Sequence, residues 1–562
     1  MLTKNISSTL GNQSLDNTVQ KEAIPAAPRD MSYQAARIAL QQAAINVLHQ
    51  YSGANEAAKK QYENISCSGE AQKIEPAVKE TIWKEAVQDY KDEQAYLQWG
   101  RIKGSLVPAD YSDVGEAKVF VREYGSCIRY CKAMDWLWFD GKRWVGKSDI
   151  KVLGLVHEFT ERQLAEADQM YQEEKNKKSP DKKRLAAIKT YRNFICKERN
   201  NRKPNNCLNQ ARPESEIKDE ELDKDGYLLN TPSGEFDLRN GKMQGHCPED
   251  FITKITPVTP SNVNADIWYK FLNRLTGGDQ ELQQYLQMVV GMAAIGKVYY
   301  EGLIIAVGEG GNGKSTFFNS IKYVLGDYAG MIDPDIFIRK VNINKSAELA
   351  TLKGERLALA AELDTGKSLD SGMLKRVSST DVISARELYQ NPMDFTPSHT
   401  MIMFTNHLPQ VDTEDEGTWD RLIIVPFKSR IRNTSGEIKD YASYLIEQCG
   451  GAILQWIIDG AAMFYEGGCR IKRPACVQKA VDEYREENDW LGHFLEEKCV
   501  MDPAYKMKAG EIYSAYKEYC DEAGETARSV IVFKSAMVRK GYVWKRKGAG
   551  RFYYGVKLSN AD

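Results

Sequence analysis

The chain has 562 residues and a formal net charge of −2, so it is too long for one hydrophobic core and we expect three to four domains. With 42% hydrophobic and 27% charged residues, its composition is that of an ordinary soluble protein. The near-neutral charge excludes a uniformly basic nucleic-acid-binding protein, so any basic surface must be local.

Cysteine usage and the lack of long apolar runs suggest an intracellular protein. The 11 cysteines are scattered without a C-x-x-C pair, which favours reduced thiols. Cys127 with Cys131, and His246 with Cys247, lack a second half with metal-ligand spacing, so we expect no structural zinc. No apolar run reaches the roughly 18 residues of a membrane span, and no signal pattern opens the chain. We therefore expect a cytoplasmic protein, in a bacterium or a phage-infected host, with no membrane partner.

The first 105 residues divide into two segments that differ in composition. Residues 1–29 are polar and predict a flexible tail. Helical patterns over 31–51 and 77–99 predict a small helical domain at 30–105. Its apolar face forms either an ordinary core or a docking site for a partner. No carboxylate-rich polymerase motif is visible there, so we expect no nucleotide polymerisation.

Residues 106–262 predict an α+β domain. Trp136–Trp144 has the pattern of a hairpin with an Asp-Gly turn, whose aromatics either pack across strands or form a base-stacking platform. A helix is expected at 150–174, and a strand–turn–strand pattern spans Leu228–Gly241.

Between these elements, residues 175–203 hold 12 Lys/Arg against two acids. This is either a phosphate-contacting patch or a solvated helix face. The acidic stretch 214–225 follows it.

A glycine-rich motif lies in the third quarter of the chain. The apolar run 303–307 leads into it, and a helix-compatible segment follows, which is the strand–loop–helix context that G-x-x-x-x-G-K-[ST] requires. Glycines let backbone N–H groups face phosphates, and the helix N-terminus favours negative charge. We expect Lys314 to reach the β/γ-phosphates and Ser315 to hold magnesium. The expected ATP-binding residues are Gly308, Glu309, Gly310, Gly311, Asn312, Gly313, Lys314, Ser315 and Thr316.

Three further polar residues follow apolar strand patterns. The run 356–361 ends at Glu362, which is expected to organise magnesium or polarise the attacking water, with Asp364 as second choice. The run 400–404 is followed by Asn406, whose neutral amide suits a γ-phosphate sensor. Arg421 precedes the strand 423–427. It is predicted to reach a neighbouring subunit's nucleotide, with a surface ion pair to Asp420 as the alternative.

The ordered set resembles a known family. The phosphate loop, Glu362-Leu363-Asp364, a hairpin pattern with its tip near Gln390, the strand ending at Asn406, and Trp419-Asp420-Arg421 are similar to superfamily 3 helicases. The nearest resemblance is to the helicase part of phage and plasmid primase–helicases and their poxvirus relatives, over about residues 105–562.

That resemblance implies a homohexameric ring that encloses single-stranded DNA and unwinds duplex 3′ to 5′, with ATP and magnesium bound between subunits. Two features depart from the family pattern: the first hundred residues are too few for a catalytic primase, and the hairpin tip carries Gln390 rather than Lys or His. The expected DNA contacts of the hairpin region are therefore Lys375, Arg376, Arg386 and Gln390.

The C-terminal region predicts helices followed by a basic hairpin. Residues 534–551 hold seven Lys/Arg and no acid, the layout of a winged helix that contacts DNA. Docking onto a partner is the alternative. The expected DNA contacts here are Lys545, Arg546, Lys547 and Arg551.

The predicted fold is an α/β AAA+ P-loop ATPase core with a mixed α+β N-terminal domain and a C-terminal helical and winged-helix domain. The expected boundaries are 1–29 tail, 30–105 helical, 106–262 α+β, 263–432 ATPase, 433–500 helical and 501–562 winged-helix-like.

The leading functional prediction is a replicative DNA helicase of a phage, plasmid or mobile element. The second is an ATP-switched initiator that melts origin DNA. The third is a scaffold whose N-terminal helices recruit a separately encoded primase or polymerase.

Overall fold

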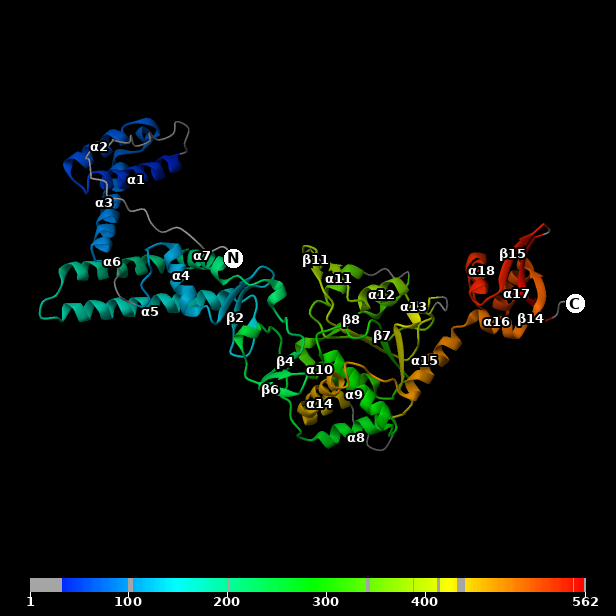
Figure 1. Cartoon of the computed structure of the whole chain (residues 1–562). Helices are drawn as coiled ribbons and strands as arrows, with labels where there is room; N and C mark the ends of the chain where they lie inside the picture. The colour runs from blue at the N-terminus through cyan, green and yellow to red at the C-terminus, as the bar shows by residue number, and fades with distance from the viewer. Residues whose placement is uncertain are drawn as a thin grey trace, which may run out of the picture. The chain divides into compact units, whose positions relative to one another are not determined.

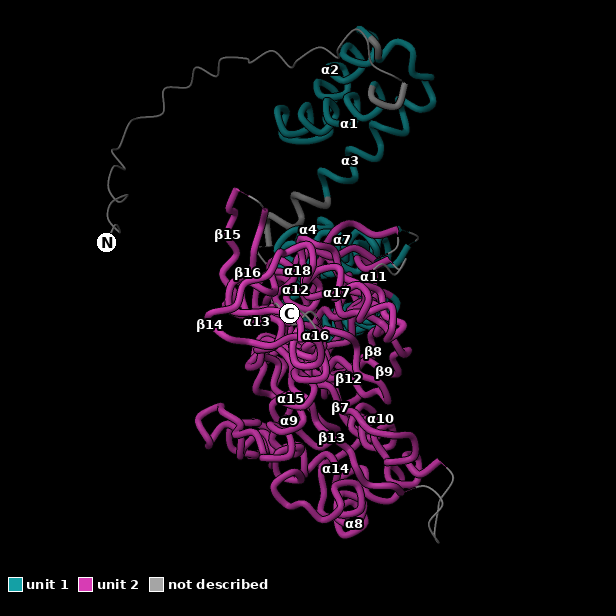
Figure 2. Tube along the Cα trace, turned by 90° about the vertical axis from the view of Figure 1, so that its right-hand side faces the viewer, with its two compact units in different colours: residues 1–125, 150–215 teal, residues 126–149, 216–562 magenta. Residues whose placement is uncertain are grey.

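A computed structural model describes residues 33–99, 105–200, 202–339, 344–387, 389–411, 415–431, 440–548 and 550–559. The chain divides into two compact units, residues 1–125 with 150–215, and residues 126–149 with 216–562 (Figure 2). The six-segment division expected above stays a prediction.

The first unit is helical. The elements that form it are α1 (Tyr33–Gln50), α2 (Glu56–Ser66), η1 (Gly69–Lys73), α3 (Pro76–Trp99), α4 (Asp113–Tyr124), α5 (Asp149–Lys175), α6 (Lys182–Glu198) and α7 (Lys203–Ser215) (Figure 1). Side chains of α1, α2 and α3, among them Leu48, Tyr62 and Trp83, share one apolar core. The helices expected near 31–51, 77–99 and 150–174 are confirmed, whereas α2 was not predicted.

Two small antiparallel sheets open the second unit. The first has the order β1 (Ile128–Cys131), β2 (Asp135–Phe139), β3 (Trp144–Val145), and the second β4 (Leu228–Thr231), β5 (Gly234–Asp237), β6 (Lys242–Gln244). Both expected hairpins are confirmed. Trp136 and Trp144 are each 1% exposed, and the Trp144 indole donates a hydrogen bond to the Pro248 carbonyl. These two tryptophans are therefore core residues and are not available as a base-stacking platform.

A five-stranded parallel sheet forms the centre of the second unit. Its order is β13 (Leu422–Pro426), β7 (Leu303–Val307), β12 (Thr400–Thr405), β9 (Leu357–Ala361), β8 (Ala329–Ile332). Successive side chains of a strand point to opposite faces. Accordingly, Ile304 and Ala306 enter one apolar core and Leu303 and Ile305 enter another. A mixed α/β architecture around a parallel sheet is therefore observed.

Helices cover both faces of this sheet. The core on one face includes residues of α8 (Ala265–Leu275), α9 (Gln280–Ala294), α10 (Lys314–Leu325) and α14 (Tyr441–Glu466). The core on the other face includes residues of α11 (Lys345–Ala350), α12 (Ser371–Ser378), α13 (Glu416–Trp419) and α15 (Ala475–Glu487). The remaining elements of this region are η2 (Asp219–Glu221), η3 (Pro248–Asp250), η4 (Gly326–Tyr328), η5 (Pro334–Phe337) and the strand pair β10 (Ile383–Ala385) and β11 (Met393–Phe395).

The C-terminal part has its own core. It comprises α16 (Trp490–Lys498), β14 (Cys499–Lys508), α17 (Ala509–Glu522), α18 (Val530–Arg539), β15 (Val543–Lys547) and β16 (Gly550–Leu558), with strand order β14-β16-β15. Phe494, Ile512, Phe533 and Tyr553 are buried together there. The two helices and the basic hairpin were predicted, and β14 was not. In the part of the chain that the structure describes, no helix is long and apolar enough to cross a membrane.

Candidate nucleotide site

The glycine-rich loop connects β7 to α10 at the carboxyl edge of the sheet. Gly311 and Gly313 have φ of 83° and 88°, in the left-handed region that glycine adopts without strain. A Cβ on Gly308 would lie 2.2 Å from the Phe427 carbonyl oxygen, so only glycine fits there. The expected strand, loop and helix are all present, and the sequence pattern dictates this backbone.

Lys314 begins α10 and is only 4% exposed. Its Nζ donates to the Gly308 carbonyl at 2.6 Å and to the side-chain oxygens of Asn312 and Asn406, each at 3.1 Å. Burial lowers the pKa of Lys314, and the negative charge of Glu362 opposes that shift. No ion pair of Lys314 occurs among the described residues. A buried cation held only by neutral oxygens suits an arriving anion.

Glu362 and Asn406 meet at the ends of neighbouring strands. The strands β9 and β12 pair in parallel, so the residues that follow them emerge at the same edge. The Asn406 amide Nδ2 donates to a Glu362 carboxylate oxygen at 3.5 Å. Glu362 has φ of 58°, an uncommon left-handed conformation for this residue type, and its N–H donates to the Phe404 carbonyl at 3.1 Å. The structure therefore brings Lys314, Asn406 and Glu362 together.

An open cavity of about 640 Å³ joins these groups. It is lined by Phe271, Arg274, Gly310, Gly311, Asn312, Gly313, Lys314, Ser315, Thr316, Asn319, Glu362, Asn406, Ile431, Asp440, Tyr441 and Ala442. Asp364, the second choice for the acid, does not line it. Its side chain is 86% exposed and lies 3.7 Å from Lys367.

Sequence reasoning missed the wall of this cavity opposite the strand ends. Phe271 and Arg274 come from α8, and Tyr441 comes from the start of α14. No short motif marks them. The orienting role of Asn312 was also missed: its Nδ2 donates to the Phe427 carbonyl at 3.0 Å while its Oδ1 accepts from the Lys314 amine.

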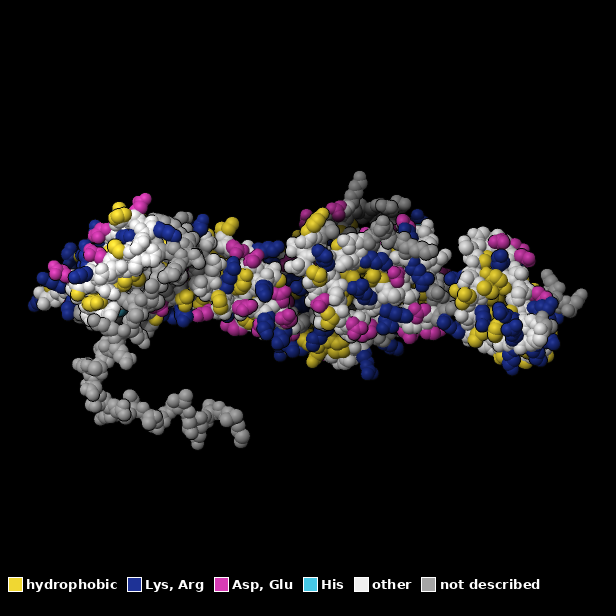
Figure 3. Space-filling view, turned by 90° about the horizontal axis from the view of Figure 1, so that it is seen from above, with side chains coloured by type: hydrophobic (Ala, Val, Ile, Leu, Met, Phe, Trp, Pro, Cys, Tyr) yellow, Lys and Arg dark blue, Asp and Glu magenta, His cyan; other side chains and the backbone are white. Residues whose placement is uncertain are grey.

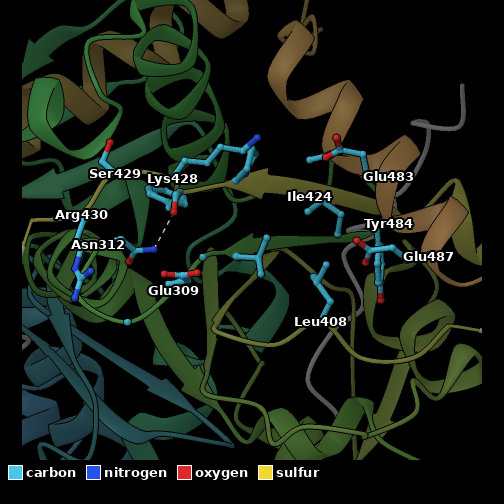
Figure 4. Close-up of a pocket in the computed structure, with 16 residues that line it drawn as sticks. Glu309, Asn312, Leu408, Ile424, Lys428, Ser429, Arg430, Glu483, Tyr484 and Glu487 are labelled. Atoms are coloured by element: carbon cyan, nitrogen blue, oxygen red, sulfur yellow. Dashed lines mark hydrogen bonds between the residues drawn. The ribbon is translucent and has the colours of Figure 1, made fainter. Parts of the chain in front are cut away.

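A second hollow of about 410 Å³ shares Gly310 and Asn312 with this cavity (Figure 4). The loop residues Gly308–Gly310 and the segment that follows β13 form one wall, and α15 contributes Glu483, Tyr484 and Glu487. This hollow contacts the loop without including Lys314, Glu362 or Asn406. We therefore place the candidate phosphate site in the larger cavity.

Arg421 lies at the opposite edge of the sheet from the glycine-rich loop. Leu422 pairs with Leu303 at the start of both strands, and Pro426 pairs with Val307 at their ends. Five residues of strand span about 16 Å, which is longer than an arginine side chain. The Arg421 guanidinium lies 3.4 Å from Glu301 and donates to the Gly417 carbonyl at 3.0 Å. The observed ion pair is therefore with Glu301 rather than with Asp420.

The expected DNA contacts of the hairpin region are partly engaged within the chain. Lys375 pairs with Asp415 at 2.7 Å, and the Arg376 guanidinium donates to the Ser384 carbonyl at 2.9 Å. Arg386 donates to the Gln390 carbonyl at 2.8 Å, across the loop between β10 and β11. The strand pair confirms the predicted hairpin, and the DNA roles stay predictions.

The expected contacts in the C-terminal part lie on one ribbon. Lys545, Arg546 and Lys547 are exposed on β15, and Arg551 is exposed on the antiparallel strand β16. Arg546 is the direct cross-strand partner of Arg551. A cluster of like charges on a two-stranded ribbon suits an anionic partner.

The basic segment around α6 is less available than its composition indicates. Arg184 pairs with Glu174 at 3.1 Å, and Arg192 pairs with Asp168 at 2.8 Å. The aromatic residues between the charges, Tyr191 and Phe194, are buried in the helical unit's core. These aromatics pack inside and do not stack on bases. Arg199 pairs with Glu161 at 3.3 Å, and the exposed lysines of α6 are Lys182, Lys183, Lys189 and Lys197.

Known proteins resemble two stretches of the chain. Residues 117–277 match the family model described as "D5 N terminal like", and residues 306–421 match a family described as of unknown function. The "Putative helicase L207/L206" of Acanthamoeba polyphaga mimivirus is 27% identical over 337 residues, which cover 56% of this chain and 34% of that protein. The "Putative primase C962R" of African swine fever virus is 26% identical over 326 residues, 53% of this chain and 34% of that protein.

Among solved structures, the C-terminal region of NrS-1 aligns with a TM-score of 0.36 at 8% identity, over 54% of this chain and 78% of that one. At that TM-score the likeness supports no statement about fold or function. The matched region spans about a third of the length of the two viral relatives. The chain therefore has a D5 N terminal like region and is similar, over about half of its length, to viral proteins named as a putative helicase and a putative primase.

Proposed function

We propose that this chain is an ATP-dependent replicative DNA helicase of a phage, plasmid or mobile element, with a superfamily 3 AAA+ core. The observation that carries the proposal is the meeting of Lys314, Asn406 and Glu362 at the carboxyl edge of a parallel sheet, beside a glycine-rich loop. Ligands of open α/β sheets bind at that edge. The names of the two viral relatives include the words helicase and primase, which supports the proposal that this chain acts on nucleic acid.

The residues present fit a nucleoside triphosphate with magnesium. Lys314 is a buried cation without a carboxylate partner among the described residues, and Gly311 and Gly313 hold the loop in left-handed turns beside it. We assign the phosphates to the loop N–H groups and to Lys314. Ser315 is exposed and lines the cavity, so its hydroxyl would hold the magnesium ion together with Glu362. Magnesium, when bound, offsets charge that develops on the phosphates.

Two side chains of the chain, Glu362 and Asn406, have different roles in the proposed hydrolysis. The Glu362 carboxylate accepts the proton of the attacking water or orients that water. The Asn406 amide lies between Lys314 and Glu362, because it accepts a hydrogen bond from the first and donates one to the second. As a neutral group it does so without adding negative charge. The Lys314 amine already donates to Gly308, Asn312 and Asn406, so it would exchange at least one of these neutral acceptors for a phosphate oxygen when the triphosphate enters.

The same geometry supports assembly into a ring. Arg421 is separated from its own glycine-rich loop by the length of the sheet. We propose that it acts on the nucleotide of an adjoining copy, as an arginine that stabilises the phosphoryl-transfer transition state. A homohexamer that encloses one DNA strand and moves 3′ to 5′ follows from the family resemblance.

The test combines ATP hydrolysis with strand displacement. Lys314→Ala should abolish hydrolysis, and the matched control Lys322→Ala, on the same helix but outside the cavity lining, should retain it. Forked DNA with one labelled strand should be separated by the wild-type protein only with ATP and magnesium. Turnover by Lys314→Ala at the wild-type rate would overturn the site, and hydrolysis without any strand separation would overturn the helicase.

The basic ribbon of the C-terminal part favours a second candidate function. Lys545, Arg546, Lys547 and Arg551 gather on β15 and β16, next to the helix α18. An initiator would use that domain to bind one origin sequence and would melt it locally in an ATP-dependent manner. Strong preference for one sequence, without displacement of long duplexes, would favour this function over the helicase.

A further inference from the structure

One face of α18 carries exposed aliphatic side chains. Val530, Ile531 and Val538 are 55%, 75% and 48% exposed. Their spacing of seven and eight residues places them on one side of the helix. Single exposed aliphatic residues are common, but a gathered set marks an interaction site. Figure 3 shows hydrophobic and basic side chains side by side on the C-terminal part, at the right of the view.

This face is one wall of a groove of about 990 Å³. The opposite walls come from the start of α17 and from the ribbon of β15 and β16. Trp544 lies between them, with the Lys534 ammonium 3.6 Å from its ring centroid and the Arg551 guanidinium 5.8 Å away. The lining consists of Lys508, Ala509, Gly510, Glu511, Val530, Ile531, Phe533, Lys534, Ser535, Val538, Arg539, Trp544, Arg551 and Tyr553.

The groove has a basic rim around an apolar floor. Four of its lining side chains are cationic and one, Glu511, is acidic. Glu511 lies 3.2 Å from Lys508, so its charge is already paired. The remaining excess is positive. Charge complementarity therefore selects an occupant that is apolar on one side and acidic beside it.

We propose that this groove binds an acidic amphipathic helix supplied by a partner protein. A helix that reads base edges needs hydrogen-bonding side chains on its exposed face. On α18 the exposed residues Val530, Ile531 and Val538 offer no hydrogen bond, and of the polar residues beside them in the groove Lys534 already lies over the Trp544 ring. Ser535 and Arg539 of the same helix also line the groove, so its surface is mixed apolar and basic. An apolar helix face laid into an apolar groove, with acids toward the basic rim, satisfies both features of the site. The ribbon residues Lys545–Lys547 do not line the groove and remain available for phosphates.

The probe is a fluorescent peptide of about 18 residues, long enough for several helical turns. Its leucines recur at three and four residues and its other positions are mostly glutamate. Anisotropy with the full chain should show saturable binding, weakened at least tenfold by Ile531→Asp and by Lys534→Glu. Ile531→Leu should retain binding. Val500→Asp is the matched control, because Val500 is 41% exposed on β14 and lies outside the groove lining.

Further measurements distinguish an acidic partner helix from DNA and from a second copy of this chain. A peptide with the same leucines and lysine in place of glutamate should bind at least tenfold more weakly, and equal binding would overturn the charge argument. Absence of peptide binding, together with loss of duplex-DNA binding in Ile531→Asp and in Val538→Asp, would reassign the face to DNA. A drop in self-association in Ile531→Asp, without peptide binding, would assign it to a second copy. None of these readouts uses ATP hydrolysis, so they are independent of the nucleotide site.

Discussion

Asn406 lies between a cation and an acid, so exchanging its amide for a carboxylate is a sharp test of the site. Its Oδ1 is 3.1 Å from the Lys314 amine, and its Nδ2 is 3.5 Å from a Glu362 oxygen. Asn406→Asp keeps the size and shape of the side chain and adds one negative charge. Asn406→Ala removes both hydrogen bonds and adds no charge. The pair separates charge from hydrogen bonding.

In the protein without nucleotide, the two new interactions of the aspartate nearly cancel. At an effective dielectric constant of about 20, attraction to Lys314 and repulsion from Glu362 are each about 5 kcal/mol. We therefore expect the free energy of unfolding to change by only about 1 kcal/mol. With ATP the balance fails, because each phosphate charge at about 4 Å adds roughly 4 kcal/mol of repulsion. ATP affinity should then fall about 10³-fold, against about 10- to 100-fold for Asn406→Ala.

Titration with a fluorescent ATP analogue in the presence of magnesium measures the affinity, and urea unfolding measures the stability. Asn55→Asp is the control for an amide-to-carboxylate exchange, since Asn55 is exposed at the start of α2, outside the cavity. If Asn406→Asp binds the analogue as tightly as Asn406→Ala does, the amide does not face the phosphates and the assignment of the site is wrong.

Three other predictions test separate parts of the molecule. Arg421→Ala should bind ATP but hydrolyse it about 10³-fold more slowly, and mixing it with Glu362→Gln subunits should restore part of the activity; wild-type turnover would refute the role. Burial raises the pKa of the Glu116 carboxyl group to about 8, above its value in the unfolded chain. The folded chain therefore holds this proton more tightly, and the free energy of unfolding falls as pH rises from about 4.5 through 8. Glu116→Gln should thus gain about 3 kcal/mol over wild type at pH 7 and under 1 kcal/mol at pH 5 in urea unfolding; an equal gain at both would contradict this. Replacing Arg546 and Lys547 by alanine should lower the salt dependence of DNA binding by about two phosphate contacts, measured by anisotropy at increasing salt; an unchanged slope would exclude the ribbon.

The glycine-rich loop and its flanking elements could be predicted because their signals are local. The strand at 303–307 was predicted with its observed bounds, since an apolar run followed by a glycine-rich turn needs no distant information. The acid and the amide were found in the same way, because each directly follows an apolar strand pattern. The sequence pattern already favoured Glu362 over Asp364, and their catalytic roles stay predictions. The structure places the first in the cavity and leaves the second in solvent.

An element could not be predicted where its own residues disfavour the secondary structure that it adopts. The strand β14 contains Asp502 and Pro503, which argue against a strand, and its pairing with β16 shifts register between Met501 and Lys506. The irregularity accommodates the proline. The cavity wall formed by Phe271 and Tyr441 was equally invisible, since these residues are about 170 positions apart in the sequence and only packing brings them together.

Parallel pairing gives the sheet two chemically different edges. Every strand that pairs with β7 or β12 in parallel delivers its following residue to the same edge, where Lys314, Asn406 and Glu362 lie. Arg421 precedes its strand, so the same rule sends it to the other edge. Under the proposal that Arg421 acts on the nucleotide of an adjoining copy, that nucleotide would approach the edge of the sheet beside Glu301.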